Sequence, residues 1–249
     1  MILIADIGNT DTKICLINLN YKIIKKVIIP SNKMNNSVLN KKLNFITKKR
    51  LFINKALFCS VVPNRYNLLK NFVKTKFKAK CVELKNLNIE KIMKIHVSRK
   101  QIGSDRLANS IAVISNNKNH IILDFGTATT FDVVIGKIYK GGVIAPGINI
   151  SLNTLINKAS LIPHMNLKKI KKVIGNNTTS AVRSGFFWGY VGLINNIIDL
   201  IKKETKKSFT IIITGGFSSL FVNALKNKVI IDKDITLKGI IKVAKIFNF

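Results

Sequence analysis

Acidic residues are scarce in this chain. It has 11 aspartates and glutamates against 42 lysines and arginines, a formal net charge of +31 at pH 7. Such a charge by itself suggests a nucleic-acid binder. The lysines, however, are scattered among asparagines and isoleucines, as in "NKKLNFITKKR" at 40–50, without an aromatic platform on which bases could stack. Because Lys, Asn and Ile are over-used throughout, we interpret the charge as a compositional bias and expect no nucleic-acid partner.

Long apolar runs and cysteines are also lacking. No run approaches the ~20 residues that a membrane-spanning helix needs. Asp6 interrupts the first apolar segment and no basic stretch precedes it, which argues against an export signal. Cys15, Cys59 and Cys81 are odd in number and lack CxxC spacing. We interpret them as buried thiols in a reducing cytoplasm. No histidine is spaced with them as a metal site would require. Since no apolar run is long enough to span a bilayer, we expect no membrane partner.

A hydrophobic fraction of 47% over 249 residues is sufficient for one large domain or two small lobes. Periodicity and turn residues predict the same order of elements, β-β-β-α-β-α, in each half. Expected strands are Ile2–Ile7, Thr12–Asn18, Lys22–Ile29, Ala56–Ser60, Ile121–Phe125, Phe131–Ile135, Ile138–Ile144 and "FTIIITGG" at 209–216. Expected helices are 37–50, 64–78, one from Gly103, one after Gly147 and one from Thr178 to about Lys203. After residue 216 we expect a short helix, a short strand and a terminal helix, "LKGIIKVAKIF" at 237–247.

The segments between these elements set the expected domain boundary. Residues 84–102 read as a polar connector and 161–177 as a loop. The asparagine-rich "NNKN" at 116–119 separates the two halves. We therefore expect an α/β protein with an N-terminal lobe, 1–117, and a C-terminal lobe, 118–249.

Two stretches share one plan. "ILIADIGNTDTKICLI" (2–17) and "IILDFGTATTFDVVI" (121–135) both place Asp-x-Gly and then Asn or Thr between two apolar strands. A glycine turn lets backbone N–H groups converge on phosphate oxygens, and an adjacent aspartate can hold hydrated Mg²⁺. One such turn is more often an ordinary hairpin. Two copies, followed by the strand-terminal "TGG" at 214–216, predict that the chain grips a polyphosphate.

Further motifs narrow this interpretation. In order, the chain carries "DIGNT" (6–10), "SVVP" (60–63), "GSDR" (103–106), "DFGTATT" (124–130), "GGVIAPG" (141–147), "NT" (177–178), "SG" (184–185) and "TGG" (214–216). Their order and spacing resemble those of type III pantothenate kinases, in the actin-like, ribonuclease-H-like phosphotransferase superfamily. The resemblance implies two actin-like lobes with a cleft between them. It also implies a cytoplasmic homodimer that uses ATP and Mg²⁺, with a monovalent cation (K⁺ or NH₄⁺), to phosphorylate pantothenate, the first step of coenzyme A biosynthesis.

The same resemblance assigns site residues. ATP contacts fall on Asp6, Ile7, Gly8, Asn9, Thr10, Asp11, Thr12, Lys13 and Thr127, and pantothenate contacts on Gly103, Ser104, Asp105, Arg106 and Thr178. Asp105 corresponds to the catalytic base that accepts the proton of the primary hydroxyl, Arg106 to a contact with the acidic substrate, and Asp124 to the ligand of the monovalent cation. Thr178 corresponds to a pantothenate contact made across the dimer interface.

Each of these residues also has a purely structural interpretation. Lys13 is one lysine among many, Arg106 could form a surface ion pair, and Asp124 and Thr127 are common turn formers. Asp105 suits the first turn of a helix, where the helix dipole would lower its pKa and weaken it as a base. Thr178 is a good helix N-cap.

The chain departs from the family pattern at four positions. His96 and Arg99 stand where the family usually has tyrosine and proline, Ser104 replaces the usual alanine, and Arg183 replaces glutamine. An imidazole at His96 could supply a hydrogen bond in place of the tyrosine.

Two other functions compete with pantothenate phosphorylation. The first is a kinase of the same superfamily with another acceptor, such as a sugar, although a neutral sugar would give Arg106 no carboxylate to bind. The second is a non-catalytic, basic regulatory relative. The presence of Asp6, Asp105 and Asp124 argues against it.

Overall fold

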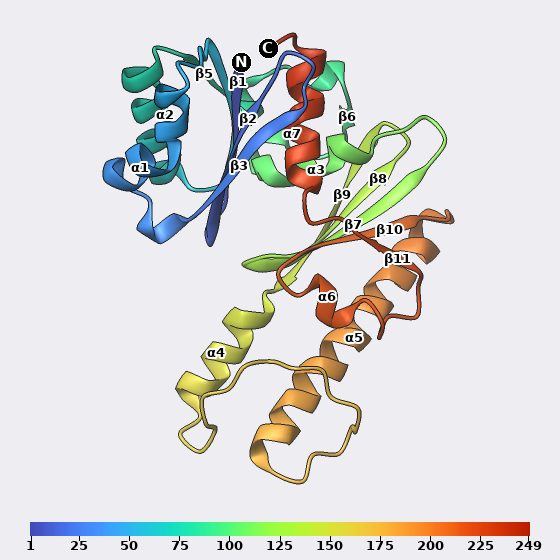
Figure 1. Ribbon diagram of the computed structural model, residues 1–249. Helices are drawn as coiled ribbons and strands as arrows, with labels where there is room; N and C mark the ends of the chain where they lie inside the picture. Colours follow the sequence, from blue (N-terminus) through green and yellow to red (C-terminus); the bar gives the residue numbers. More distant parts are fainter. The chain divides into compact units, whose positions relative to one another are not determined.

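The computed structural model describes all residues, 1–249, and its helices and strands alternate as the sequence predicts (Figure 1). The chain divides into two compact units. Unit 1 comprises Met1–Val113 and Asp234–Phe249, and unit 2 comprises Ile114–Lys233. No helix combines the length and hydropathy needed to span a lipid bilayer.

Unit 1 is built on a mixed sheet with the strand order β3-β2-β1-β4-β5. The strands are β1 (Ile2–Ile7), β2 (Asp11–Ile17), β3 (Ile23–Pro30), β4 (Lys55–Ser60) and β5 (Lys80–Glu83). β1 pairs antiparallel with β2 and parallel with β4. Both faces of β1 are buried, which explains its nearly continuous run of apolar residues.

Helices cover both faces of this sheet (Figure 1). On one face, α1 (Asn36–Lys48) and α2 (Pro63–Phe77) bury their apolar sides against alternate residues of the strands. The Asn35 side chain caps α1 by accepting a hydrogen bond from the amide of Val38, and α2 begins with Pro63. The other face is covered by α3 (Ser104–Val113) and α7 (Ile235–Ile246).

The position of α7 corrects the expected domain boundary. The sequence analysis placed the last helix in a lobe of residues 118–249, whereas residues 234–249 pack in unit 1. α7 and α3 approach so closely that a Cβ on Gly239 would lie 1.9 Å from the carbonyl oxygen of Ala108. Thr236 also donates a buried 2.8 Å hydrogen bond to Asn109. The apolar side of α7 therefore completes the core of unit 1, a long-range preference that a linear pattern does not show.

Unit 2 has its own sheet, in the order β11-β10-β7-β8-β9. Its strands are β7 (Asn119–Phe125), β8 (Ala128–Ile135), β9 (Ile138–Pro146), β10 (Thr210–Gly215) and β11 (Val229–Ile231). The long α5 (Thr178–Thr205) buries Phe187, Ile194 and Ile198 against this sheet together with the short α6 (Ser218–Phe221). α4 (Ile148–Lys158) and the first half of α5 extend beyond the sheet, joined by the segment 159–177 (Figure 1).

The expected strands and helices are confirmed to within a few residues at their ends. The connector 84–102 differs from the expectation of a polar segment. It contains the short β6 (Lys94–Ile95) and the 3-10 turns η2 (Leu84–Asn86), η3 (Ile89–Lys91) and η4 (Arg99–Gln101). It also buries five apolar side chains: Leu84, Ile89, Ile92, Met93 and Ile102. Single apolar residues in a polar stretch carry no helical or strand period, so the pattern could not reveal them. Cys15 and Cys59 are buried thiols as expected, whereas Cys81 is only partly buried.

Candidate active site

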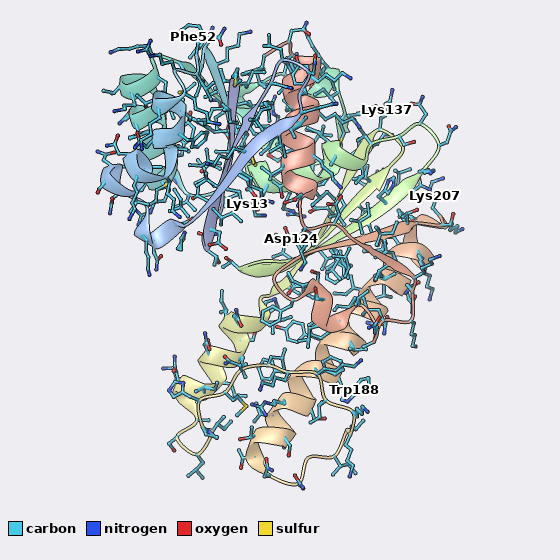
Figure 2. All side chains as sticks on the ribbon, in the orientation of Figure 1. Lys13, Phe52, Asp124, Lys137, Trp188 and Lys207 are labelled. Carbon is cyan, nitrogen blue, oxygen red and sulfur yellow. The ribbon has the colours of Figure 1, made fainter.

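The first acidic turn lies in unit 1, between β1 and β2. Asp6 and Lys13 face each other across these strands, with Lys13 Nζ 3.7 Å from Asp6 Oδ2 (Lys13 is labelled in Figure 2). The amide of Gly8 donates a 3.1 Å hydrogen bond to the Asp11 carbonyl and closes the turn. Asn9, Thr10 and Asp11 are exposed at its tip, where their amides and side chains can meet a ligand.

The surroundings of Asp6 disfavour its ionised form. Burial raises the pKa of Asp6 to about 6, and Lys13 opposes this rise only in part. The negative charge of Asp105 raises the pKa of Asp6 further, so these two carboxylates are electrostatic neighbours. Two carboxylates and one lysine leave an excess of negative charge at this site, which a divalent cation would compensate.

Asp105 is the second residue of α3, and its carboxylate lies close to Gly103, two residues earlier. Its Oδ1 accepts a 2.8 Å hydrogen bond from the amide of Arg106. A Cβ on Gly103 would lie only 2.4 Å from the same oxygen, so any larger residue at position 103 would displace the Asp105 carboxylate. The expectation that the helix dipole lowers the pKa of Asp105 is wrong: burial raises it, and the Arg106 amide and guanidinium compensate only partly. Desolvation outweighs the dipole because the carboxylate is packed below the surface.

Ser104, next to Asp105, makes a contact that the sequence analysis did not predict. Its hydroxyl is buried, with the residue 1% exposed, and donates a 2.7 Å hydrogen bond to Oε1 of Glu83 at the end of β5. The Glu83 carboxylate also accepts hydrogen bonds from the backbone amides of Ser60 and Lys85, and burial raises its pKa. Glu83 thus joins the start of α3 to the "SVVP" segment. The serine in place of the family's alanine was the only signal of this link.

The second acidic turn belongs to unit 2 and connects β7 to β8. Asp124 pairs with Thr130 across these strands and is labelled in Figure 2, while Thr127 is exposed in the turn itself. The amide of Gly126 donates a 3.1 Å hydrogen bond to the Ala128 carbonyl. A Cβ on Gly147 would lie 1.8 Å from the carbonyl oxygen of Thr127, so the "GGVIAPG" segment packs directly against the turn.

The "TGG" motif lies beside the same turn. Thr214 pairs with Asp124 between β10 and β7, and the amide of Gly216 donates a 3.2 Å hydrogen bond to the Phe125 carbonyl. Gly215 has φ +86°, a conformation that other residues rarely adopt, and a Cβ there would lie 2.4 Å from the Phe125 oxygen. Three motifs that are far apart in the sequence therefore form one surface within unit 2.

Thr178 lies apart from these turns, at the exposed first position of α5. The expectation that it caps the helix is wrong. Asn177 is the N-cap and forms a capping box with Ser180. In unit 2, this end of α5 is the one remote from the sheet (Figure 1).

The unusual residues of this chain have structural contacts of their own. Where the family usually has proline, the guanidinium of Arg99 donates hydrogen bonds to the carbonyls of Lys85 and Leu87 and so fixes the loop that follows β5. Nε of Arg183 donates a 3.1 Å hydrogen bond to the carbonyl of Asn166. His96 is exposed.

Comparison with known proteins identifies the family. A family profile described as "Type III pantothenate kinase" matches residues 2–200. The chain is 61% identical over 248 residues to the type III pantothenate kinase of Pelagibacter ubique, with 100% of both chains covered. This chain belongs to the type III pantothenate kinases. It is also 34% identical to the type III pantothenate kinase of Ehrlichia canis, covering 97% of this chain and 94% of that one.

Solved structures confirm the actin-like α/β fold of this family member. A Campylobacter jejuni protein assigned to the Baf family of transcriptional activators superposes with a TM-score of 0.64 at 20% identity, covering 99% of this chain and 98% of that one. Glucokinase from an Antarctic psychrotroph superposes with a TM-score of 0.52 at 12% identity, covering 100% and 99%. At such identities these likenesses establish the fold alone.

Proposed function

We propose that this type III pantothenate kinase transfers the γ-phosphoryl group of ATP to the primary hydroxyl of pantothenate, giving 4′-phosphopantothenate and ADP in the first step toward coenzyme A. One observation in unit 1 carries the mechanism. Asp105, at the start of α3, is close enough to the Asp6–Lys13 hairpin for its charge to act on Asp6. A candidate base therefore stands next to a candidate phosphate-binding turn.

The hairpin 6–13 binds the nucleotide's phosphates in this proposal. The amides and side chains of the exposed tip, Asn9, Thr10 and Asp11, contact the phosphate oxygens, and Lys13 adds positive charge. Ile7 and Thr12 were also expected to contact ATP, but they are buried, with 1% and 0% of their surface exposed, so their side chains shape the turn from within. Asp6 organises the Mg²⁺ that arrives with ATP. Its pKa of about 6 supports this role, since a carboxylate with too little compensating charge gains most from a cation.

The start of α3 binds and activates the acceptor. Asp105 accepts the proton of the pantothenate hydroxyl as the phosphoryl group moves, and its raised pKa makes it a stronger base than an ordinary aspartate. Arg106 binds the pantothenate carboxylate, and Gly103 and Ser104 shape the same turn. Phosphoryl transfer through a loose transition state depends mainly on positioning and charge stabilisation, which these groups provide.

Unit 2 contributes the remaining ligands. In this proposal Asp124 binds K⁺ or NH₄⁺, Thr127 contacts ATP, and the "TGG" motif contacts the nucleoside. The packing of Gly147 and Gly215 against the turn supports these roles, because it fixes the backbone from which Asp124 and Thr127 project.

We further propose a cytoplasmic homodimer in which Thr178 reaches the partner's pantothenate. Exposed apolar side chains in the segment 159–177, which leads into α5, support an interface there: Leu161 is 89% exposed, Val173 66% and Ile174 88%. Three free cysteines support a reducing compartment.

An ADP-release assay over a panel of acceptors tests the proposal. Pantothenate, several sugars and acetate are compared under the same ATP and Mg²⁺ conditions. ADP release with pantothenate alone is the expected result. Turnover of a sugar would indicate the alternative kinase, and no ADP release together with salt-sensitive DNA binding would indicate the regulatory relative.

A further inference from the structure

Ser31 is a buried residue that forms hydrogen bonds to the first acidic turn, between β1 and β2. This serine follows β3, at the start of the 3-10 turn η1 (Ser31–Lys33), and only 2% of its surface is exposed. Its amide donates a 2.8 Å hydrogen bond to the carbonyl of Thr10, and its hydroxyl donates a 2.6 Å bond to the carbonyl of Gly8. Thr12 Oγ1 lies 2.9 Å from the Ser31 hydroxyl and is 0% exposed. One residue outside the "DIGNT" motif thus contacts three residues of the turn.

The direction of these hydrogen bonds can be deduced. A hydroxyl has a single hydrogen, and that of Ser31 is directed to the Gly8 carbonyl. In the contact between the two hydroxyls, Thr12 is therefore the donor and Ser31 the acceptor. The result is a buried chain from Thr12 through Ser31 to the Gly8 carbonyl, in which each bond polarises the next.

These hydrogen bonds also set the direction of two amides in the turn. In a trans peptide the N–H points opposite to the C=O of the same unit. Because the carbonyls of Gly8 and Thr10 point toward Ser31, the amides that follow them, those of Asn9 and Asp11, point away from it. Asn9 and Asp11 are exposed residues at the tip of the turn, where a ligand can reach them.

We propose that Ser31 is a positioning residue for the nucleotide, which aims the Asn9 and Asp11 amides at the phosphates of ATP. The proposal rests on the proposed function only in taking ATP as the ligand of this turn. Ser31 touches no substrate itself. It acts through the peptide units 8–9 and 10–11, whose rotation would turn a phosphate-binding N–H group into a repelling carbonyl.

Four single variants test this role. Ser31→Ala removes both hydroxyl contacts, Ser31→Thr keeps the hydroxyl, and Thr12→Val removes only the first bond without changing the side chain's shape. Ser37→Ala is the matched control, because Ser37 is an exposed serine in the same unit. Each is assayed for KM with ATP, KM with pantothenate and kcat, and ATP binding is measured independently by titration calorimetry.

We expect Ser31→Ala to weaken ATP binding and raise its KM about tenfold, the size of one lost buried hydrogen bond, with the KM for pantothenate within twofold of the wild-type value. Ser31→Thr should restore most of the affinity, Thr12→Val should show a smaller loss, and Ser37→Ala should show none. A folded Ser31→Ala protein with unchanged ATP affinity, or with equal rises in both KM values, would overturn the role. If Ser31→Ala does not fold, Thr12→Val is the test, and an unchanged ATP affinity of that variant would overturn the role.

The titration separates this idea from the proposed function. A wild-type protein that binds ATP but does not phosphorylate pantothenate would refute the acceptor and leave the Ser31 test intact. A wild-type protein that binds no ATP would refute both.

Discussion

The hydroxyl of Ser104 donates a 2.7 Å hydrogen bond to the carboxylate of Glu83, and so connects the first residue of α3 to the end of β5. Ser104→Ala removes a bond to a charged acceptor, and we expect it to lower the free energy of unfolding by about 1.5–3 kcal/mol. Ser110→Ala is a matched control on the same helix. Ser110 is also buried, but its hydroxyl donates to the Arg106 carbonyl four residues earlier, which the helix itself can satisfy. Urea denaturation of both variants measures the difference, and equal losses would contradict a special role of Glu83.

The pH dependence of stability reports on Asp6. Its pKa is raised from 3.8 to about 6 in the folded protein, so the folded state binds the proton more tightly than the unfolded chain. The contribution of Asp6 to stability is therefore most favourable below pH 3.8 and declines as the pH rises to about 6. The decline amounts to roughly 3 kcal/mol.

Asp6→Asn should remove this decline. We expect the free energy of unfolding of the variant, minus that of the wild type, to increase between pH 4 and pH 7 in the absence of nucleotide, as measured by denaturant titration at each pH. A difference that stays constant with pH would show that Asp6 titrates normally. The same variant should lose ATP-dependent activity, because in the proposed function the Asp6 carboxylate organises the Mg²⁺ that arrives with ATP.

Asp105→Asn tests the base. We expect kcat to fall by about 10²–10⁴, the usual contribution of a positioned base, while the thermal unfolding midpoint and the ATP affinity stay near their wild-type values. Steady-state kinetics and calorimetry measure these quantities. An active Asp105→Asn protein would contradict the assignment of the base.

The contact between α7 and α3 should be intolerant of any side chain at Gly239. Gly239→Ala places a Cβ 1.9 Å from the Ala108 carbonyl oxygen, so the two helices must separate. We expect a loss of about 3 kcal/mol or more, at the upper end of overpacking effects. Gly192→Ala is the control, because Gly192 lies inside α5 with open space at its Cβ position and should gain about 0.5–1 kcal/mol from helix propensity. Thermal unfolding measures the stability of both variants, and similar stability changes in the two would contradict the close packing of α7 and α3.

The monovalent cation gives the fifth prediction. Replacement of K⁺ by Na⁺ at constant ionic strength should lower kcat/KM severalfold if Asp124 binds the cation, because the smaller ion fits a K⁺ site poorly. Asp124→Asn should have low activity in both salts, without the difference between them. A wild-type rate that is the same in K⁺ and Na⁺ would exclude a K⁺-specific site.

Much of the fold could be read from local patterns, for reasons visible in particular segments. The apolar run Ile2–Ile7 predicted a strand, and the structure buries both of its faces. A helix was expected from Thr178 to about Lys203, and α5 is observed over Thr178–Thr205. The motifs around Asp6 and Asp124 were found because the same Asp-x-Gly plan occurs twice between apolar strands, whereas a single copy would be an ordinary hairpin turn. The capping of α5 was assigned to the wrong neighbour, since asparagine and threonine both suit an N-cap and only the backbone distinguishes them.

What the sequence alone determined about this protein is its family and its order of elements, because these depend on residue types and short-range spacing. Only the tertiary structure decided that α7 closes unit 1, that Glu83 anchors the helix carrying Asp105, and that Ser31 forms hydrogen bonds to the turn between β1 and β2. It also reversed the expected direction of the Asp105 pKa shift. Burial and contacts between residues far apart in the chain set these features, and both depend on which surfaces meet once the chain has folded.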